Sequence, residues 1–573
     1  MVQNVFRIVY KEVRGLHQAA YVLAVFTFGS QLLALVRDRL LAHEFGASTE
    51  LDLYYAAFRI PDVLYVIFAS TLSVYVLIPF LARKAETGVP SAAKNLLSQF
   101  FSLFILLYGA VALVAMIGAP LMVTYLFPGF AGESETLVAL IRILLVQPLL
   151  LGISSLFSIV TQMEHRFILY ALSPLLYNLG IIAGLLFLYP SMGVYGLVLG
   201  VLLGAMGHVC IQIPSVIRSP LAPRFVWTFV HMDIVMVCKT SFTRALTLSF
   251  HQLVLLGFVS VASLMAVGSV SVFQFAYNLQ SVPLAVIGVS YSVAAFPLLA
   301  QLYAEKQYAQ FAYSITTALK HIFFWSLPVI ALLVVIRAQV VRVVLGSGAF
   351  DWSDTRLTAA VLAIFILSLT AQAIHLVIVR ALYAVENTRL PFVVTLFSSA
   401  FALLGAYAFH TVLLAQGDFY SLVERMMRLE GVSGIEVLAL PLGYSCALIL
   451  HSAILLILAR KDLYIQGKTL VVPFVQSFIS AIFAGYVAYI LLNYFVLAFT
   501  VDTLFTVFAQ GFLAAVGGGV GYVVLQYLFK NEELIEISKT LHKHCSRRGV
   551  PLPQNKGTLC DVAVPQDEDT LAV

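Results

Sequence analysis

The stretch "GSQLLALVRDRLLAHEFGASTELDLYYAAFRIPDVLYVIF" (residues 29–68) places charged side chains inside two long apolar runs joined by a short turn. Arg37 and Asp38 fall late in the first run, and Asp52 and Arg59 fall early in the second. Ionisable groups in membrane-length apolar runs are costly unless they face a cavity or a partner. Because the turn is short, we expect these four groups to approach one another.

The composition around this stretch is that of a membrane protein. The chain has 573 residues, of which 61% are hydrophobic and only 11% are charged, whereas soluble domains carry about 25% charged residues. This excludes a soluble enzyme, a disordered chain and a disulfide scaffold. The formal net charge of +5 is too small to suggest a nucleic-acid partner. The sequence therefore predicts an all-α polytopic membrane protein.

Fourteen apolar runs are long enough to cross a bilayer. Two of them contain a proline, Pro61 in the second and Pro283 in the eighth, and we expect each to kink its helix. The expected transmembrane spans are 20–42, 53–82, 96–126, 136–161, 167–189, 192–216, 240–266, 270–302, 313–345, 357–384, 391–414, 438–459, 471–498 and 503–529.

Charges in the loops alternate in sign along the chain. Basic residues gather before the first span, in every second loop and after the last span, whereas the other loops carry mainly acidic residues such as Glu133, Glu135 and Asp418. Cytoplasmic loops of membrane proteins are enriched in Lys and Arg. The pattern predicts that both termini are cytoplasmic, which an even number of spans satisfies.

Two short stretches recur at nearly the same offset. "PFLA" at 79–82 resembles "PLLA" at 297–300, 218 positions later, and the segment around Phe130 resembles that around Phe350, 220 positions later. We therefore predict two six-span lobes in parallel orientation, related by an axis along the membrane normal. Transporters built in this way place the substrate path between the lobes and work by alternating access.

The domain organisation follows from these patterns. The expected units are a cytoplasmic segment (1–19), an N-lobe with spans one to six (20–216), a C-lobe with spans seven to twelve (217–460), two further spans (461–530) and a cytoplasmic, disordered tail (531–573). The outer loop 415–437 has a helical period and is expected to form a surface helix on the bilayer.

The polar residues within spans have two interpretations. The charged group that includes Arg37 and Asp52 is either an ion-pair cluster that fixes helix ends or a gate and ligand site between the lobes. His251 and Gln252 lie deep in the seventh span and are candidates to line a cavity. Asn278, just before Pro283, either lines the cavity or caps carbonyls that the kink frees.

No catalytic or nucleotide-binding motif is present in the sequence. HExxH, GxSxG, Walker and Cys/His metal spacings are all missing. We therefore expect a transporter and not an enzyme, with no cofactor or metal. Any coupling would be to the membrane potential, to an ion gradient or to the gradient of the substrate itself.

Several motifs together resemble the MurJ/MviN family of lipid II flippases, which belongs to the multidrug/oligosaccharidyl-lipid/polysaccharide exporter superfamily. The resemblance rests on the quoted stretch and on "LFPGF", "YNLGI", "GAFDWSDTRLTA" and "RALYAVENTRLPF", and it covers about residues 20–460. It implies two six-helix lobes plus two helices in the bacterial inner membrane. It also implies outward flipping of an undecaprenyl-pyrophosphate-linked precursor for peptidoglycan, with membrane lipids and cell-wall synthesis proteins as further partners.

The chain departs from the family in its polar set. Such flippases line the cavity with several arginines, which suit pyrophosphate oxygens, and only Arg37 is clearly kept. Gln31, Tyr65 and Asn278 stand at other cationic positions, and Phe258 stands at an acidic position linked to sodium in some members. The expected substrate or gate residues are Arg37, Asp38, Asp52 and Arg59, with Gln31, Tyr65, His251, Gln252 and Asn278 as polar cavity residues.

In this interpretation Arg37 attracts a phosphate, and Asp52 pairs with it or gates the outer side. Three alternatives stay open at this point. The protein could flip a different lipid-linked glycan, it could be a drug or organic-cation antiporter of the same superfamily, or it could be a non-transporting membrane scaffold for envelope assembly.

Overall fold

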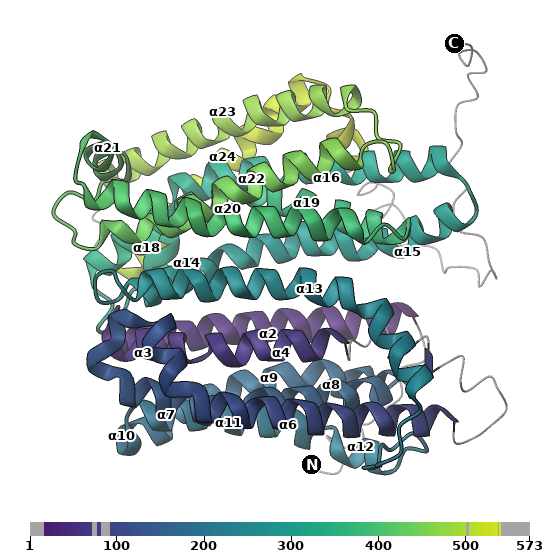
Figure 1. The fold of residues 1–573 in the computed structure, drawn as a ribbon. Coiled ribbons are helices and arrows are strands. Elements are labelled where there is room, and N and C mark those ends of the chain that lie inside the picture. The colour runs from purple at the N-terminus through teal and green to yellow at the C-terminus, as the bar shows by residue number, and fades with distance from the viewer. Residues whose placement is uncertain are drawn as a thin grey trace, which may run out of the picture.

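The computed structural model describes residues 16–71, 77–78, 80–81, 92–499, 503–536 and 538–539. Helices from the first part of the chain form the N-lobe, the lower half in Figure 1. They are α2 (Leu16–Phe45), α3 (Thr49–Ala57), α4 (Arg59–Thr71), α6 (Ala92–Leu126), η1 (Pro128–Glu133), α7 (Ser134–Leu144), α8 (Gln147–Met163), α9 (Phe167–Ala183), η2 (Gly184–Leu188), α10 (Tyr189–Met192), α11 (Val194–Cys210) and α12 (Ile213–Ile217).

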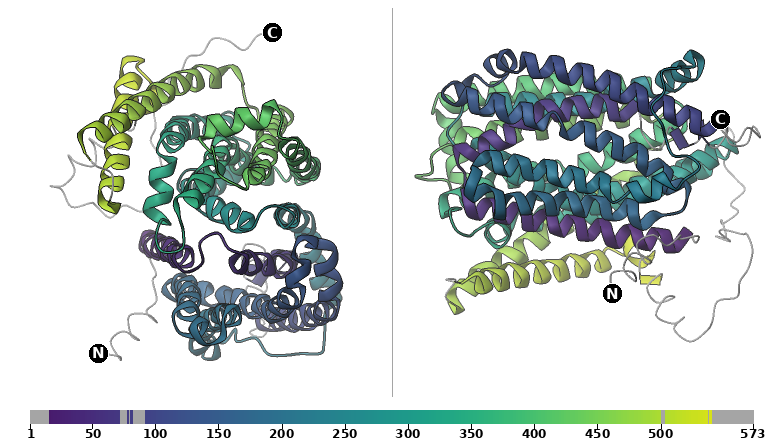
Figure 2. Two further views of the ribbon diagram at one scale, coloured as in Figure 1. Left: turned by 90° about the vertical axis from the view of Figure 1, so that its left-hand side faces the viewer. Right: turned by 90° about the horizontal axis from the view of Figure 1, so that it is seen from below.

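The C-lobe lies against the N-lobe, and a last pair of helices covers its far side (Figures 1 and 2). Its elements are α13 (His231–Ala262), α14 (Ser269–Leu284), η3 (Ala285–Val289), α15 (Ser290–Ala304), α16 (Tyr308–Val335), α17 (Arg337–Val344), α18 (Trp352–Leu367), α19 (Leu369–Ala384), α20 (Arg389–Leu414), α21 (Asp418–Met427), η4 (Ile435–Leu438) and α22 (Ala439–Ala459). The last pair is α23 (Lys468–Ala498) and α24 (Leu504–Leu528).

Apolar helices of membrane length dominate the described residues. Eleven of them are long and apolar enough to cross a bilayer, and they coincide with the third to ninth and eleventh to fourteenth expected spans. The tenth expected span is the pair α18 and α19, which meet at a bend of 43°. The all-helical membrane fold is confirmed, but the count of fourteen is not. The first expected span falls on α2, and the second is divided between α3, α4 and residues outside the described part.

The two expected proline kinks take different forms. The helix breaks at Phe58, between α3 and α4, and Pro61 then occupies the first turn of α4, where a proline removes no needed hydrogen bond. Pro283 lies inside α14, and the chain passes directly into the π-helical turn η3 before continuing as α15. A π turn absorbs the register change that a proline causes in a long span.

The buried core joins the lobes at one end of the bundle. This end carries α3, α10 and α21 and is called the α3 end here; the opposite end carries α12 (Figure 1). One large apolar cluster at the α3 end includes Phe45 and Phe130 of the N-lobe and Phe273 and Phe350 of the C-lobe. One further cluster lies within the N-lobe, and two others join the C-lobe to α23 and α24. Burial of apolar surface therefore ties the lobes together mainly at the α3 end.

A glycine seam sets the position of α9 in the N-lobe. A Cβ atom on Gly200 of α11 would lie 2.4 Å from the Cα of Gly184, and one on Gly204 would lie 2.4 Å from the carbonyl oxygen of Tyr177. Small residues of this kind let membrane helices approach until their backbones touch. The seam fixes the face of α9 that carries Tyr177 and Asn178.

Three other expectations concern the internal repeat, the loop 415–437 and the tail. Phe130 and Phe350 are both buried just before a helix, α7 and α18, while the superposition of the two lobes stays a prediction. The loop 415–437 contains the expected helix, α21, with Leu422 and Met426 exposed and Leu429 buried beyond its end. Most of the tail that follows position 530 lies outside the described residues.

Candidate functional site

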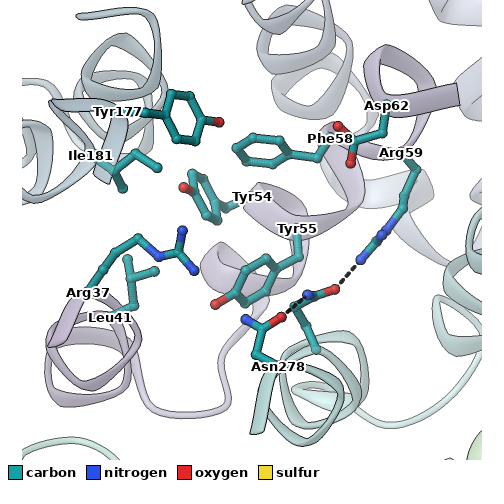
Figure 3. A pocket seen from close by; sticks show the side chains of 11 residues that line it. Arg37, Leu41, Tyr54, Tyr55, Phe58, Arg59, Asp62, Tyr177, Ile181 and Asn278 are labelled. Atoms are coloured by element: carbon teal, nitrogen blue, oxygen red, sulfur yellow. Dashed lines mark hydrogen bonds between the residues drawn. The ribbon is translucent and has the colours of Figure 1, made fainter. Parts of the chain in front are cut away.

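A cavity of about 140 Å³ lies between the lobes. Four N-lobe helices and one C-lobe helix line it, and its aromatic rings lie between Arg37 on one side and Arg59 and Asp62 on the other (Figure 3). The lining residues are Arg37, Leu41, Tyr54, Tyr55, Phe58, Arg59, Asp62, Tyr177, Ile181, Gln274 and Asn278. Three of the nine predicted site residues are thus part of its wall: Arg37, Arg59 and Asn278.

Arg37 is held by its sequence neighbour. Its Nε and Nη2 both donate to Oδ1 of Asp38, at 2.9 and 2.7 Å, and its Nη1 donates to Oδ1 of Asn178 at 3.0 Å. Adjacent residues on a helix do not normally face each other, so the long arginine side chain has to curl back to reach Asp38. The charge of Arg37 is therefore neutralised by a buried carboxylate.

The pairing expected between Arg37 and Asp52 does not form. The carboxylate of Asp52 instead receives the N–H of Gly268 at 2.7 Å, the N–H of Ser271 at 2.8 Å and the hydroxyl of Ser271 at 2.5 Å. Asp52 lies in the first turn of α3, whereas Arg37 lies more than two turns before the end of α2. The turn between α2 and α3 thus separates the two groups, and Asp52 caps α14 of the opposite lobe.

Other contacts at the α3 end support this connection between the lobes. Oδ2 of Asp354 accepts the N–H of Ala47 at 3.1 Å, and the N–H of Ala349 donates to the carbonyl of His43 at 2.8 Å. Gly268 has a φ of +85°, and a Cβ there would lie 2.5 Å from the carbonyl oxygen of Ala47. We call these contacts the α3-end latch, with Asp52, Ala47, Gly268, Ser271 and Asp354 as its residues.

A relay of amides crosses between the lobes beside the cavity. Nδ2 of Asn278 on α14 donates to Oδ2 of Asp38 at 2.9 Å. Nε2 of Gln274, one turn earlier, donates to Oδ1 of Asn278 at 2.7 Å. Oε1 of Gln274 in turn accepts from Nη2 of Arg59. The amide of each residue therefore donates one hydrogen bond through its nitrogen and accepts one through its oxygen. The relay connects α2 to α4 through the C-lobe helix α14.

Arg59 differs from Arg37 in lacking a bound carboxylate. Its side chain extends away from Asp62 and toward α14 (Figure 3), and the structure records no ion pair between these two described residues. Arg59 is only 6% exposed, and its Nε has no hydrogen-bond partner. A buried guanidinium with a free donor is costly. Asp62 on the same cavity wall acts on Arg59 electrostatically but forms no hydrogen bond with it, so the Nε–H donor stays available to an acceptor in the cavity.

The remaining predicted polar residues do not reach the cavity wall. Tyr65 has its hydroxyl 3.3 Å from Oγ of Ser155, within the N-lobe. His251 has Nε2 3.0 Å from the hydroxyl of Tyr277, within the C-lobe. Gln252 is half-buried and Gln31 is exposed. Phe258, at the family's acidic position, is fully buried against the rings of Phe273 and Tyr444.

Sequence reasoning missed several wall residues. Gln274 lies four positions before Asn278, so both amides share one face of α14; this spacing was visible in the sequence. Tyr54, Tyr55 and Tyr177 gave no such signal, because tyrosines are common in apolar spans. Among the described residues, no group of three His, Cys, Asp or Glu side chains is placed to hold a metal ion.

The fold and the cavity define a class of protein: a polytopic helical transporter with two lobes around a polar central site. A sequence model described as "Lipid II flippase MurJ" matches residues 41–509. The chain belongs to the MurJ family.

Relatives and solved structures agree with this assignment. The chain is 26% identical over 381 residues to a probable lipid II flippase MurJ of Rhizobium tropici, covering 64% of this chain and 70% of the relative. It is 23% identical to lipid II flippase MurJ of Burkholderia cenocepacia, covering 66% and 75%. A solved MurJ structure in an inward closed conformation superposes with a TM-score of 0.70 at 22% identity, covering 90% of this chain and 100% of that one.

The fold extends to a wider group of transporters. An inward-facing multidrug resistance MATE transporter of the MOP superfamily superposes with a TM-score of 0.62 at 14% identity, covering 76% of this chain and 94% of that chain. This likeness concerns the fold alone.

Proposed function

We propose that this protein is a lipid II flippase, which carries an undecaprenyl-pyrophosphate-linked cell-wall precursor across the bacterial cytoplasmic membrane by alternating access. Membership of the MurJ family supports the substrate class. The transporter role, the absence of catalysis and a place among cell-wall synthesis proteins are parts of the same proposal.

The observation that carries the proposal is the state of Arg59. This guanidinium lines the cavity, is almost fully buried and keeps an unused Nε–H donor without a paired carboxylate. Pyrophosphate oxygens accept hydrogen bonds from guanidinium groups in a forked geometry, and the attraction strengthens away from water. An anionic headgroup thus supplies what Arg59 lacks.

The role of Arg37 changes accordingly. Because Asp38 already neutralises it, Arg37 cannot attract a phosphate without giving up that ion pair. We assign Arg37 and Asp38 to holding α2 against α14 through Asn278, and Arg59 to the first contact with the headgroup.

The size of the cavity supports a transport cycle that involves movement. A volume of about 140 Å³ holds a few water molecules, far less than a lipid-linked disaccharide peptide needs. The lobes must therefore separate to admit the substrate. With the orientation that the loop charges predict, the α3 end faces outward, and the latch there closes the outer side.

Complementation tests this function. A bacterium depleted of its own MurJ should regain growth when this chain is expressed, and should not when the chain carries Arg59→Ala. Arg142→Ala provides the matched control, because Arg142 is exposed and its Nε donates only to the carbonyl of Met116. Failure of the unaltered chain, present in the membrane at normal level, would refute lipid II as the substrate.

A further inference from the structure

Two histidines of the C-lobe lie ring against ring. His375 on α19 and His451 on α22 have ring centroids 4.5 Å apart, with the ring planes at 75°. The helices are fixed beside them by Ser452, whose hydroxyl donates to the carbonyl of Ala371 at 2.6 Å. Burying two polar rings within a membrane-spanning lobe costs free energy, and polar groups at such positions are commonly functional.

Each ring keeps one buried nitrogen without a partner. Nδ1 of His451 lies 2.6 Å from Oγ of Ser398, which leaves its Nε2 buried and unpartnered. Nδ1 of His375 is buried and unpartnered as well. His451 is only 2% exposed, whereas His375 is half-buried. The pair therefore offers a basic nitrogen inside the lobe, with His375 as its more accessible member.

Among the described residues, no carboxylate is recorded as a partner of either ring. His251 on α13 lies within electrostatic range of His375, and its own partner is the hydroxyl of Tyr277 on α14. Arg380 follows on α19 itself. The other neighbours of α19 bring their charges at helix ends or already paired: Asp354 on α18, Arg389 on α20 and Lys320 on α16, which is bonded to Glu532.

The sequence adds a second, independent observation. No Asp or Glu occurs in residues 240–304, 308–350, 355–384, 389–414 or 439–459. The membrane-spanning parts of the C-lobe therefore contain no carboxylate, and imidazole is the only side chain there that changes charge near neutral pH.

A short polar path connects the pair to the cavity. His251 lies within electrostatic range of Arg59 on one side and of His375 on the other. Its Nε2 is 3.0 Å from the hydroxyl of Tyr277, which belongs to the same helix as Gln274 and Asn278. Charges interact strongly over such distances where water is excluded. An anion beside Arg59 would therefore favour a positive charge on the histidines.

We propose that His375 and His451 form a shared proton-binding site that is linked to anion binding in the central cavity. A proton from water adds to an unpartnered ring nitrogen and forms one N–H bond, with no other bond made or broken. Because two charged imidazoles in contact repel each other, the pair binds roughly one proton. That proton partly compensates the charge of the headgroup that crosses the bilayer. This inference rests on the proposed function.

The test measures binding of undecaprenyl pyrophosphate to the full-length, detergent-solubilised protein as a function of pH. Linkage of one proton changes affinity by up to about tenfold per pH unit. The unaltered protein should bind several-fold more tightly as the pH falls from about 7 to 5, as the buried pair takes up its proton. His375→Asn and His451→Asn should both flatten this slope, and protonation of the ligand itself is common to all variants.

His410→Asn is the matched control. His410 is buried in the same lobe, its Nδ1 is likewise unpartnered, and no second imidazole is recorded against its ring. It should keep the slope of the unaltered protein. If an asparagine variant does not fold, His451→Gln replaces it. An unchanged slope in the pair variants, or a slope lost equally in His410→Asn, overturns the proposal.

A ligand-free titration separates this proposal from the function on which it rests. Ring NMR of labelled histidine should show that His451→Asn moves the titration midpoint of His375, because the two rings share one proton. A midpoint that does not move overturns the shared site whatever the substrate is. If the unaltered protein does not bind undecaprenyl pyrophosphate at any pH while the midpoint moves, the proposed substrate is wrong and the proton site stands.

Discussion

The carboxylate of Asp52 in the N-lobe receives both the backbone N–H and the hydroxyl of Ser271 in the C-lobe, at 2.8 and 2.5 Å. These two residues are 219 positions apart in the chain. One acidic side chain thus caps a helix of the opposite lobe at the α3 end. We expect the strength of this capping contact to influence how easily that end of the protein opens.

The first prediction concerns this contact. Asp52→Ala leaves the N–H groups of Gly268 and Ser271 without their acceptor, and we expect a loss of about 2 kcal/mol in stability. The α3 end should also open more often. A cysteine introduced at Ala47 should then react several-fold faster with a membrane-impermeant maleimide.

Thr503→Ala is the control for that experiment. Thr503 also caps a helix, by accepting the N–H of Thr506 at 3.2 Å, but both residues belong to the start of α24, outside the two lobes. Its loss should lower stability without faster labelling at position 47. Equal labelling in the two variants would mean that Asp52 does not hold the lobes together.

The second prediction concerns the pair of Arg37 and Asp38. Arg37→Ala leaves a carboxylate that is 3% exposed without its cation, and we expect a cost of about 2 kcal/mol, moderated because Arg37 is partly exposed. The double variant Arg37→Ala/Asp38→Ala should be less destabilised than the sum of the single variants. It should also recover most of the transport that Arg37→Ala loses. Thermal unfolding and lipid flipping of all three variants measure this, and additive losses would contradict a structural ion pair.

The third prediction concerns the amide relay. Asn278→Leu removes the donor to Asp38 and the acceptor of Gln274 together, so α2 and α14 lose their hydrogen-bonded connection. We expect a loss of about 1–3 kcal/mol and a wider separation of these helices. Distance measurements between spin labels on α2 and α14 detect the change. Asn387→Leu is a suitable control, because Asn387 is a half-buried amide that donates to Asp462 away from the cavity. An unchanged distance in Asn278→Leu would remove the relay from the account.

The fourth prediction concerns pH and the cap on α18. The backbone N–H of Asp354 lowers the pKa of the Asp351 carboxyl below its usual value. A carboxyl with a lowered pKa in the folded state stabilises the protein above its unfolded pKa, and this contribution is lost as the pH falls through the folded pKa. The stability difference between the unaltered protein and Asp351→Asn should therefore shrink in acid. A difference that grows as the pH falls would contradict the cap.

Local patterns in the sequence were sufficient for most of the fold. Apolar length located the spans from the third onward, and Pro61 and Pro283 lie near two of the places where the backbone departs from an uninterrupted helix. The contacts between residues of the two lobes could not be predicted from such local patterns. Asp52 was expected beside Arg37 because their runs are joined by a short turn, but a helix end and a turn separate them.

For the candidate site, too, the sequence was sufficient to select single residues but not their partners. Arg37, Arg59 and Asn278 could be selected because polar residues within spans are rare and costly. Their partners could not be selected, since Asp38 meets Asn278 across 240 positions of chain. The contact of His375 with His451 likewise arises only when α19 packs against α22. Whether a given arginine is neutralised by a carboxylate depends on such distant contacts, and for this reason Arg59, and not Arg37, is assigned to the headgroup.

The most direct test of the account is flipping of lipid II by the purified full-length protein in proteoliposomes, compared between Arg59→Ala, Arg59→Lys and Arg142→Ala. We predict that Arg59→Ala abolishes flipping while the protein stays folded, that Arg59→Lys keeps a small part because it retains the charge but not the fork, and that Arg142→Ala flips normally. Normal flipping by Arg59→Ala would contradict the claim that this buried, unpaired guanidinium receives the pyrophosphate.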